Sequence, residues 1–191
     1  MRAALVAFAC LLCVAACSPA REKGTPGPSP PAGAADSRPL PSPLPDVVAR
    51  VNGRAVRLAQ ILPIAMTKLK RVPAAPQEQR KAEALRLALG EYVERELLLQ
   101  EALARGVSAD ARSVDWAYDQ MRRTHPDEAD WAKYLAAEGM DPQSLRAELR
   151  IQQTVAALVD REAASRGVPP DEARTALVAA LRARARIELF L

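Results

Sequence analysis

Alternating apolar positions lie at both ends of the part of the chain that carries a folding pattern. Val47 to Val56 predicts two short strands joined by Asn52-Gly53, a dipeptide suited to a tight hairpin because both turn residues tolerate positive φ. Ile187 to Leu191 repeats the alternation. Because two short strands are not stable alone in water, we expect this last strand to pair with the first hairpin.

Between these strands the apolar positions recur at helical spacing, which predicts a succession of helices. Asp141 followed by Pro142 suits a helix start, and Gly106 suits a helix end. The fold class is therefore mainly α, a helical body with a small sheet formed by the N-terminal hairpin and the C-terminal strand. The predicted helices are Leu58 to Arg71, Gln77 to Arg105, one from a cap at Ser108 or Asp110 to the break at His125-Pro126, Asp127 to Glu138, Asp141 to about Ser165, and one opening at Pro169-Pro170.

The first seventeen residues have the pattern of a secretory signal. Arg2 precedes an apolar stretch, Ala3 to Val14, that is too short to cross a bilayer. Val14-Ala15-Ala16-Cys17 resembles the bacterial lipobox, which predicts a signal peptide at 1–16 and a lipid on Cys17. By resemblance to lipoprotein sorting, Ser18 points to the outer membrane. The alternative is an ordinary signal peptide in which the cysteines are apolar filler.

Composition separates a tether from a domain. Residues 17–45 carry nine of the sixteen prolines and no aromatic residue, so we expect a disordered tether. Residues 46–191 are long enough for one domain with a self-sufficient core. Loss of Arg2 with the signal peptide lowers the formal net charge from +4 to +3, too weak a balance to predict a nucleic-acid partner.

Catalytic side chains are scarce after Cys17. All three cysteines lie within the first seventeen residues, so a lipid on Cys17 excludes disulfides and thiol catalysis. His125, the single histidine, precedes Pro126 at a helix break and is expected to be a loop residue rather than a ligand or base. Zinc and triad sites need partners that the sequence does not supply. We expect no enzyme, metal or cofactor.

Four segments in one order resemble the N-terminal domain of the SurA, PrsA and PpiD group of extracytoplasmic folding factors. They are Val48 to Gly53, Tyr92 to Ala102 with Arg105-Gly106-Val107 after it, Tyr134 to Met140, and Leu145 to Arg150. Relatives usually carry a parvulin prolyl isomerase domain after the last of these helices, where this chain has only Ala164 to Val168. Arg57 stands where relatives commonly place Ser or Thr as a helix cap.

The resemblance implies a periplasmic, lipid-anchored, chaperone-like protein of the bacterial envelope that binds unfolded or partly folded exported polypeptides without isomerase activity. The other interpretation is a structural or adaptor lipoprotein with one fixed protein partner. Adaptable and aromatic side chains suit the walls of a peptide groove, although the same residues also suit a core. These candidates are Trp116, Met121, Trp131, Tyr134 and Met140.

Arg182, Arg184 and Arg186 alternate just before the last strand, a spacing that would place them on one strand face. Such a row suits a membrane surface or an acidic client, but it also suits a solvated edge that charge protects from aggregation. The paired strands are distant in sequence, so a homodimer in which two chains exchange their last strands is an alternative.

Overall fold

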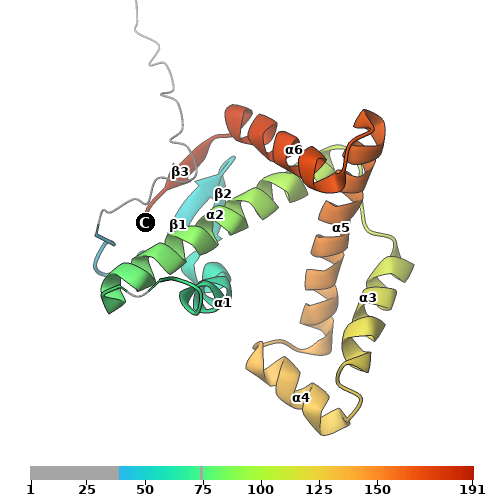
Figure 1. Cartoon of the computed structure of the whole chain (residues 1–191), viewed down its shortest axis with the longest axis horizontal. Coiled ribbons are helices and arrows are strands. Elements are labelled where there is room, and N and C mark those ends of the chain that lie inside the picture. Colours follow the sequence, from blue (N-terminus) through green and yellow to red (C-terminus); the bar gives the residue numbers. More distant parts are fainter. Residues whose placement is uncertain (1–38, 74) are drawn as a thin grey trace, which may run out of the picture. The chain divides into compact units, whose positions relative to one another are not determined.

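The computed structural model describes residues 39–191 except residue 74. Within this part of the chain, β1 (Val47–Val51), β2 (Arg54–Arg57) and β3 (Ile187–Leu189) form one antiparallel sheet in the order β2-β1-β3 (Figure 1). The register of β1 with β3 places Glu188 opposite Arg50. The prediction that the last strand returns to the first hairpin is confirmed.

The turn between β1 and β2 has the predicted geometry. Asn52 and Gly53 both have positive φ, at 51° and 85°. The Asn52 side chain also joins three parts of the domain: its Oδ1 accepts from Arg186 N–H over 2.9 Å, and its Nδ2 donates to Gln100 Oε1 over 2.8 Å. One residue therefore connects the turn to the chain entering β3 and to a long helix.

Six helices lie between β2 and β3 in the region that the structure describes, which confirms the mainly α fold class. The broad apolar stripe of the longest helix is explained by its position, since it packs on the sheet and on three other helices. The helices are α1 (Leu58–Leu69), α2 (Gln77–Ala104), α3 (Ala111–Arg123), α4 (Glu128–Ala137), α5 (Pro142–Arg166) and α6 (Pro170–Arg184).

Short polar side chains and a glycine set the helix ends, as the sequence predicts. Asp110 caps α3, so Asp110 rather than Ser108 is the capping residue. Asp127 Oδ1 accepts from Ala129 N–H and Asp141 Oδ1 from Ser144 N–H, each over 2.7 Å. Gly167 follows α5 with a φ of 66°, a left-handed conformation that suits glycine.

The backbone N–H groups at the start of α1 are bound by Gln60 and Asp46. Arg57 stands at the N-cap, and its backbone N–H donates to the side-chain oxygen of Gln60 over 2.8 Å. The Arg57 guanidinium reaches Asp46 Oδ2, also over 2.8 Å, and Leu58 N–H donates to Asp46 O over 2.7 Å. Gln60 and Asp46 thus stabilise a start that has no Ser or Thr cap.

The buried apolar side chains form two clusters, where the sequence led us to expect one core. The first cluster lies among the sheet, α1, α2, α5 and α6, and includes Val48, Ile61 and Leu98. The second is smaller and belongs to α3, α4 and the first half of α5. Leu40 and Leu44, just before the predicted start of the domain, pack against the first cluster.

Three large apolar residues that recur at helical spacing are exposed. Leu62 and Met66 on α1 are 42% and 68% exposed, and Leu103 near the end of α2 is 59% exposed. Ile61 and Ala65 cover the inner side of α1 instead. The buried face of α1 is therefore narrower than its apolar periodicity indicates.

The arginine row before β3 is not a strand face, and that expectation was wrong. Arg182 and Arg184 belong to α6. Arg182 donates to Glu94 over 3.1 Å, Arg184 donates to Glu101, and Arg186 contacts Glu188. The helix continues to Arg184 because Leu177, Val178 and Leu181 are buried on its inner side. The predicted signal peptide, Cys17 and most of the tether lie outside the described residues.

Candidate functional site

The second cluster is built by three helices from a small set of buried apolar side chains. α3 contributes Val114, α4 contributes Trp131 and Leu135, and α5 contributes Leu145 and Leu149. Each pair within a helix is four residues apart and so lies on one helix face. The cluster is small enough that aromatic and thioether side chains at its edge stay partly exposed.

An aromatic stack crosses the edge of this cluster. The rings of Trp131 and Tyr134, three residues apart on α4, lie with their centroids 5.5 Å apart and at 18° to each other. His125 stacks on Tyr134 at 4.5 Å, and Tyr118 meets Trp131 edge to face at 5.6 Å. Four rings from α3, α4 and the turn between them therefore form one continuous surface.

Two arginines lie over these rings. The guanidinium carbon of Arg146 lies 3.6 Å from the ring centroid of Tyr118, and that of Arg122 lies 5.5 Å from the Trp131 ring. Cations over aromatic faces are stabilised by the quadrupole of the ring. Arg122 also donates to Glu128 over 2.8 Å and to the carbonyl oxygen of His125, so it holds the turn between α3 and α4.

Tyr134 connects the stack to a methionine. Its hydroxyl lies 3.4 Å from the sulfur of Met121, which is a weak acceptor. Burial and the nearby carboxylate of Glu138 raise the pKa of the Tyr134 hydroxyl above its ordinary value, so this group stays a protonated donor at neutral pH.

The five candidate wall residues differ in their surroundings. Trp131 is 4% exposed and is a core residue, which is the alternative that the sequence left open. Met121, Tyr134 and Met140 are half-buried and pack against the second cluster. Trp116 is 64% exposed on α3 and is not part of the cluster. Four of the five are therefore brought together, and three of these four keep exposed surface.

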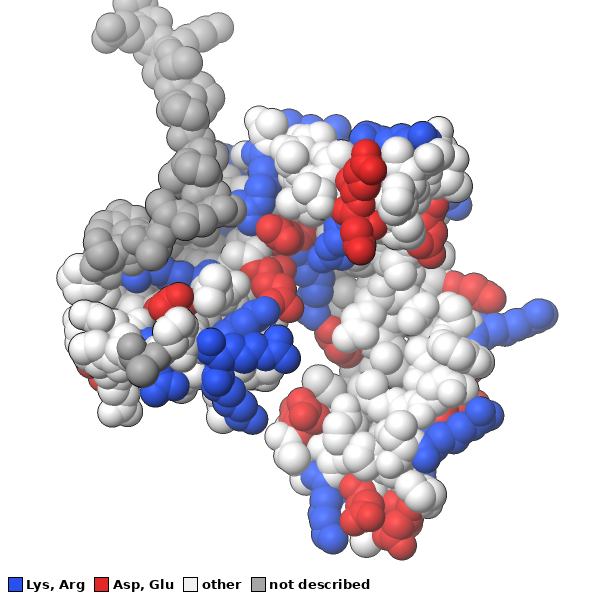
Figure 2. All heavy atoms as spheres, in the orientation of Figure 1, with Lys and Arg blue, Asp and Glu red and all other residues white. Residues whose placement is uncertain are grey.

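The surface over these helices carries few charges. Figure 2 shows mostly uncharged residues over α3, α4 and the adjacent half of α5, with Lys, Arg, Asp and Glu side chains along the margins. We call the half-buried residues Met121, Tyr134 and Met140 the apolar surface. Trp116 is not part of it, because it lies two residues from Val114 and from Tyr118 and so points to the opposite side of α3.

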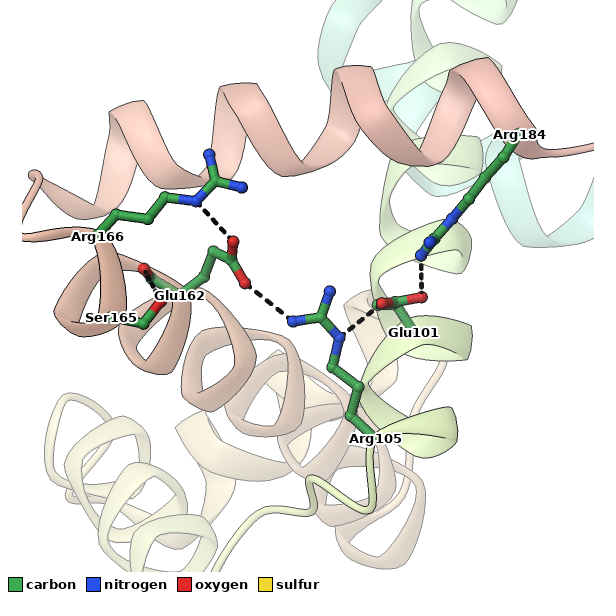
Figure 3. Close-up of polar contacts among 6 residues, drawn as sticks. All are labelled: Glu101, Arg105, Glu162, Ser165, Arg166 and Arg184. Atoms are coloured by element: carbon green, nitrogen blue, oxygen red, sulfur yellow. Dashed lines mark hydrogen bonds and ion pairs between the residues drawn. The ribbon is translucent and has the colours of Figure 1, made fainter. Parts of the chain in front are cut away.

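A row of alternating charges joins α5, which packs beneath this surface, to the end of α2, and joins α2 to α6. Figure 3 shows the row: Arg184, Glu101, Arg105, Glu162 and Arg166. Arg105 donates from Nε to Glu101 over 2.6 Å and from Nη1 to Glu162 over 2.9 Å. Arg166 donates to the other Glu162 oxygen over 2.7 Å, and Arg184 donates to Glu101.

The arginines change the ionisation of this row. Burial raises the pKa of Glu101, but hydrogen bonds from Arg105 and Arg184 outweigh it and bring the pKa below its ordinary value of 4.5. The hydrogen bond from Arg105 also lowers the pKa of Glu162, against a smaller effect of burial. Both carboxylates stay ionised at neutral pH, so the row remains intact there.

Several contributors to this site were not predicted. His125 was expected to be an ordinary loop residue, yet its ring stacks on Tyr134. Arg122 lies four residues after Tyr118, a spacing that places both on one face of α3 and could have suggested a joint role. No local signal places Arg146 beside Tyr118, because their contact depends on how α5 packs against α3.

Among the described residues, no group of three or more His, Cys, Asp and Glu side chains is placed to hold a metal ion. The same part of the chain contains no helix with the length and apolar character needed to span a membrane. Comparisons with protein-family models, with curated proteins and with solved structures found no match to this chain.

Proposed function

We propose that the domain binds unfolded or partly folded exported polypeptides on the apolar surface, without prolyl isomerase catalysis. The observation that carries the proposal is the edge of the second cluster. Met121, Tyr134 and Met140 remain half-exposed around buried Trp131. Exposed apolar groups at the edge of a cluster mark binding surfaces more often than isolated ones do.

The residue types suit varied polypeptide segments. Thioether side chains adjust to different partners because they are flexible and polarisable. Tyrosine and tryptophan supply large apolar area and a polar group that can meet the backbone of a bound segment. A rigid support is also present, because the row of charges from Arg184 to Arg166 fixes the helix beneath the surface.

The connectivity of the chain supports the absence of isomerase activity. α5 ends at Arg166 and α6 begins at Pro170, so residues 167–169 alone join the two helices. In the group that the sequence resembles, an isomerase domain usually occupies this place. In the same group a closing helix and strand usually return to the first hairpin, and α6 with β3 agrees with this arrangement. A lipid on Cys17 would attach the domain to the periplasmic face of the outer membrane.

Suppression of aggregation tests the proposal. We would mix the chain from Ser18 to Leu191, which keeps every described residue, with unfolded exported proteins at near-equal molar ratios. We expect dose-dependent suppression across unrelated clients and a clear loss with Met121→Ser combined with Met140→Ser. Leu103→Ser, which changes an exposed apolar residue on another helix, is the control and should suppress aggregation like the parent chain.

Two results would contradict the proposal. No suppression with any client would favour the adaptor with one fixed partner, and pull-downs from envelope extracts with the parent chain and the Met121→Ser/Met140→Ser variant would then identify that partner. Faster refolding of a substrate limited by proline isomerisation would show catalysis, which the proposal excludes.

A further inference from the structure

α1 presents an exposed apolar row that continues into basic residues. Leu62, Met66 and Lys70 are spaced by four residues, so they follow one another along one side of the helix and its C-cap. Leu62 and Met66 are exposed, while their neighbours Ile61 and Ala65 are buried. Arg71 extends the basic end of the row. We call Leu62, Met66, Lys70 and Arg71 the α1 face.

The charged residues of the segment that carries this face are all basic. Residues 58–77 contain Lys68, Lys70 and Arg71 and no Asp or Glu, although acidic and basic residues are interspersed elsewhere in the domain. Lys68 pairs with Glu91 on α2. Lys70 and Arg71 are exposed and form no ion pair among the described residues. In Figure 2, Lys and Arg side chains gather around the place where Figure 1 labels α1.

The α1 face is separate from the apolar surface of α3 to α5. α1 packs against α2 and β2, and its inner residues Ile61 and Ala65 belong to the first cluster. Met121, Tyr134 and Met140 pack against the second. A partner on the α1 face therefore leaves the proposed polypeptide site open.

The combination of apolar and basic residues selects the partner. A second copy of the chain would bring the same positive charges together, which is unfavourable. A bilayer with anionic headgroups can bind both parts of the α1 face. The leucine and methionine side chains enter the apolar part of the interface, and the lysine and arginine side chains contact the headgroups. We propose that the α1 face contacts an anionic lipid surface. Such a contact orients the domain on a membrane, and it is too small to replace an anchor.

Vesicle flotation tests the proposal with the chain from Ser18 to Leu191, which lacks the apolar signal and all cysteines. Vesicles of phosphatidylcholine alone would be compared with vesicles containing phosphatidylglycerol. We expect binding only to the anionic vesicles, weakened by salt. Since each basic residue contributes about fivefold to such binding, Lys70→Gln with Arg71→Gln should weaken it roughly 25-fold. Leu62→Ser with Met66→Ser should also weaken it.

Matched variants separate the α1 face from general charge and hydrophobicity. Arg150→Gln with Arg161→Gln removes two exposed arginines of α5 that form no ion pair among the described residues, and Leu103→Ser removes an exposed leucine of α2. We expect both to bind like the parent chain. Equal losses with these controls, or equal binding to neutral and anionic vesicles, would overturn the proposal.

A dye at one position gives an independent readout. Because the chain from Ser18 has no cysteine, Met66→Cys carries a unique label site, and Leu103→Cys is its control. We expect the fluorescence of an environment-sensitive dye at position 66 to shift to the blue with anionic vesicles and that of a dye at position 103 to stay unchanged. An unchanged spectrum at position 66 would contradict the proposal.

Discussion

Arg54 on β2 donates from Nη1 to Glu96 on α2 over 3.0 Å, so an exposed residue of the sheet edge satisfies a carboxylate that is 6% exposed. Gln100 Nε2 donates to the same oxygen over 2.7 Å and also reaches the carbonyl oxygen of Val51 over 3.3 Å. The buried acid is therefore held by one residue of the sheet and one of its own helix.

Removing the arginine should leave Glu96 short of a partner. We expect Arg54→Met to lower the free energy of unfolding by about 1–2 kcal/mol, measured by urea denaturation at pH 7. In a Glu96→Gln background the same change should cost less, because the neutral side chain is easier to bury. Equal costs in the two backgrounds would show that Arg54 acts through other contacts.

The hairpin turn gives a second prediction. Asn52→Ala places an alanine at a φ of 51° and removes the contacts to Arg186 and Gln100. The left-handed conformation alone costs about 1–2 kcal/mol. Asn52→Gly removes the same contacts but tolerates the conformation, so thermal unfolding should place the alanine variant below the glycine variant. Equal stability of the two variants would assign the role of Asn52 to its side-chain contacts alone.

The charged row at α2, α5 and α6 predicts a dependence of stability on pH. Glu101 and Glu162 have lowered pKa values in the folded state. An unfolded chain therefore binds more protons than the folded chain below about pH 4.5. The stabilisation is complete above that pH and is lost as pH falls through the folded-state values.

Urea midpoints between pH 7 and pH 3 would measure this loss. Because Arg105 lowers both values, Arg105→Gln should be less stable than the parent at pH 7, and the difference should shrink in acid. Lys133→Gln is the control, since its pair with Asp130 is exposed on both sides. It should follow the parent at every pH. If the difference in stability between Arg105→Gln and the parent stayed constant from pH 7 to pH 3, Glu101 and Glu162 would not be the groups responsible for the pH dependence.

Truncation of the two tryptophans should affect stability to very different extents. Trp131→Ala removes the centre of the second cluster and should cost about 3–5 kcal/mol. Trp116→Ala changes an exposed side chain and should alter stability by no more than about 0.5 kcal/mol. Because the clusters are separate, hydrogen exchange should show α3 and α4 losing protection in Trp131→Ala before α2 does. Simultaneous loss throughout would mean that the clusters unfold together.

Local signals account for the parts of the fold that were predicted from sequence. The Asn52-Gly53 turn, the caps at Asp110 and Asp141, and Gly106 after α2 all depend on residues next to one another in the chain. The pairing of β3 with β1 followed from a simple requirement, because neither end could be stable without the other.

The errors arose where the outcome depended on tertiary packing. Periodicity alone could not show that Leu62 and Met66 lie outside the first cluster, or that buried residues form two clusters. Arg182 and Arg184 alternate like a strand, but the buried Leu177 and Leu181 keep that segment helical. At the site, His125 reaches Tyr134 only because α4 folds back beside the end of α3.

The bonds between Asn52 and Arg186 join residues that are 134 positions apart. A chain that emerges gradually, from a ribosome or through a membrane pore, makes its first hairpin early and must keep it without its third strand until Leu189 has followed. Contacts this distant in sequence slow folding, because a long loop must close before they form. During that interval the helices can assemble while the edge of β1 stays unpaired. A chain that is slow to complete its sheet is therefore most prone to associate with a second chain at this edge.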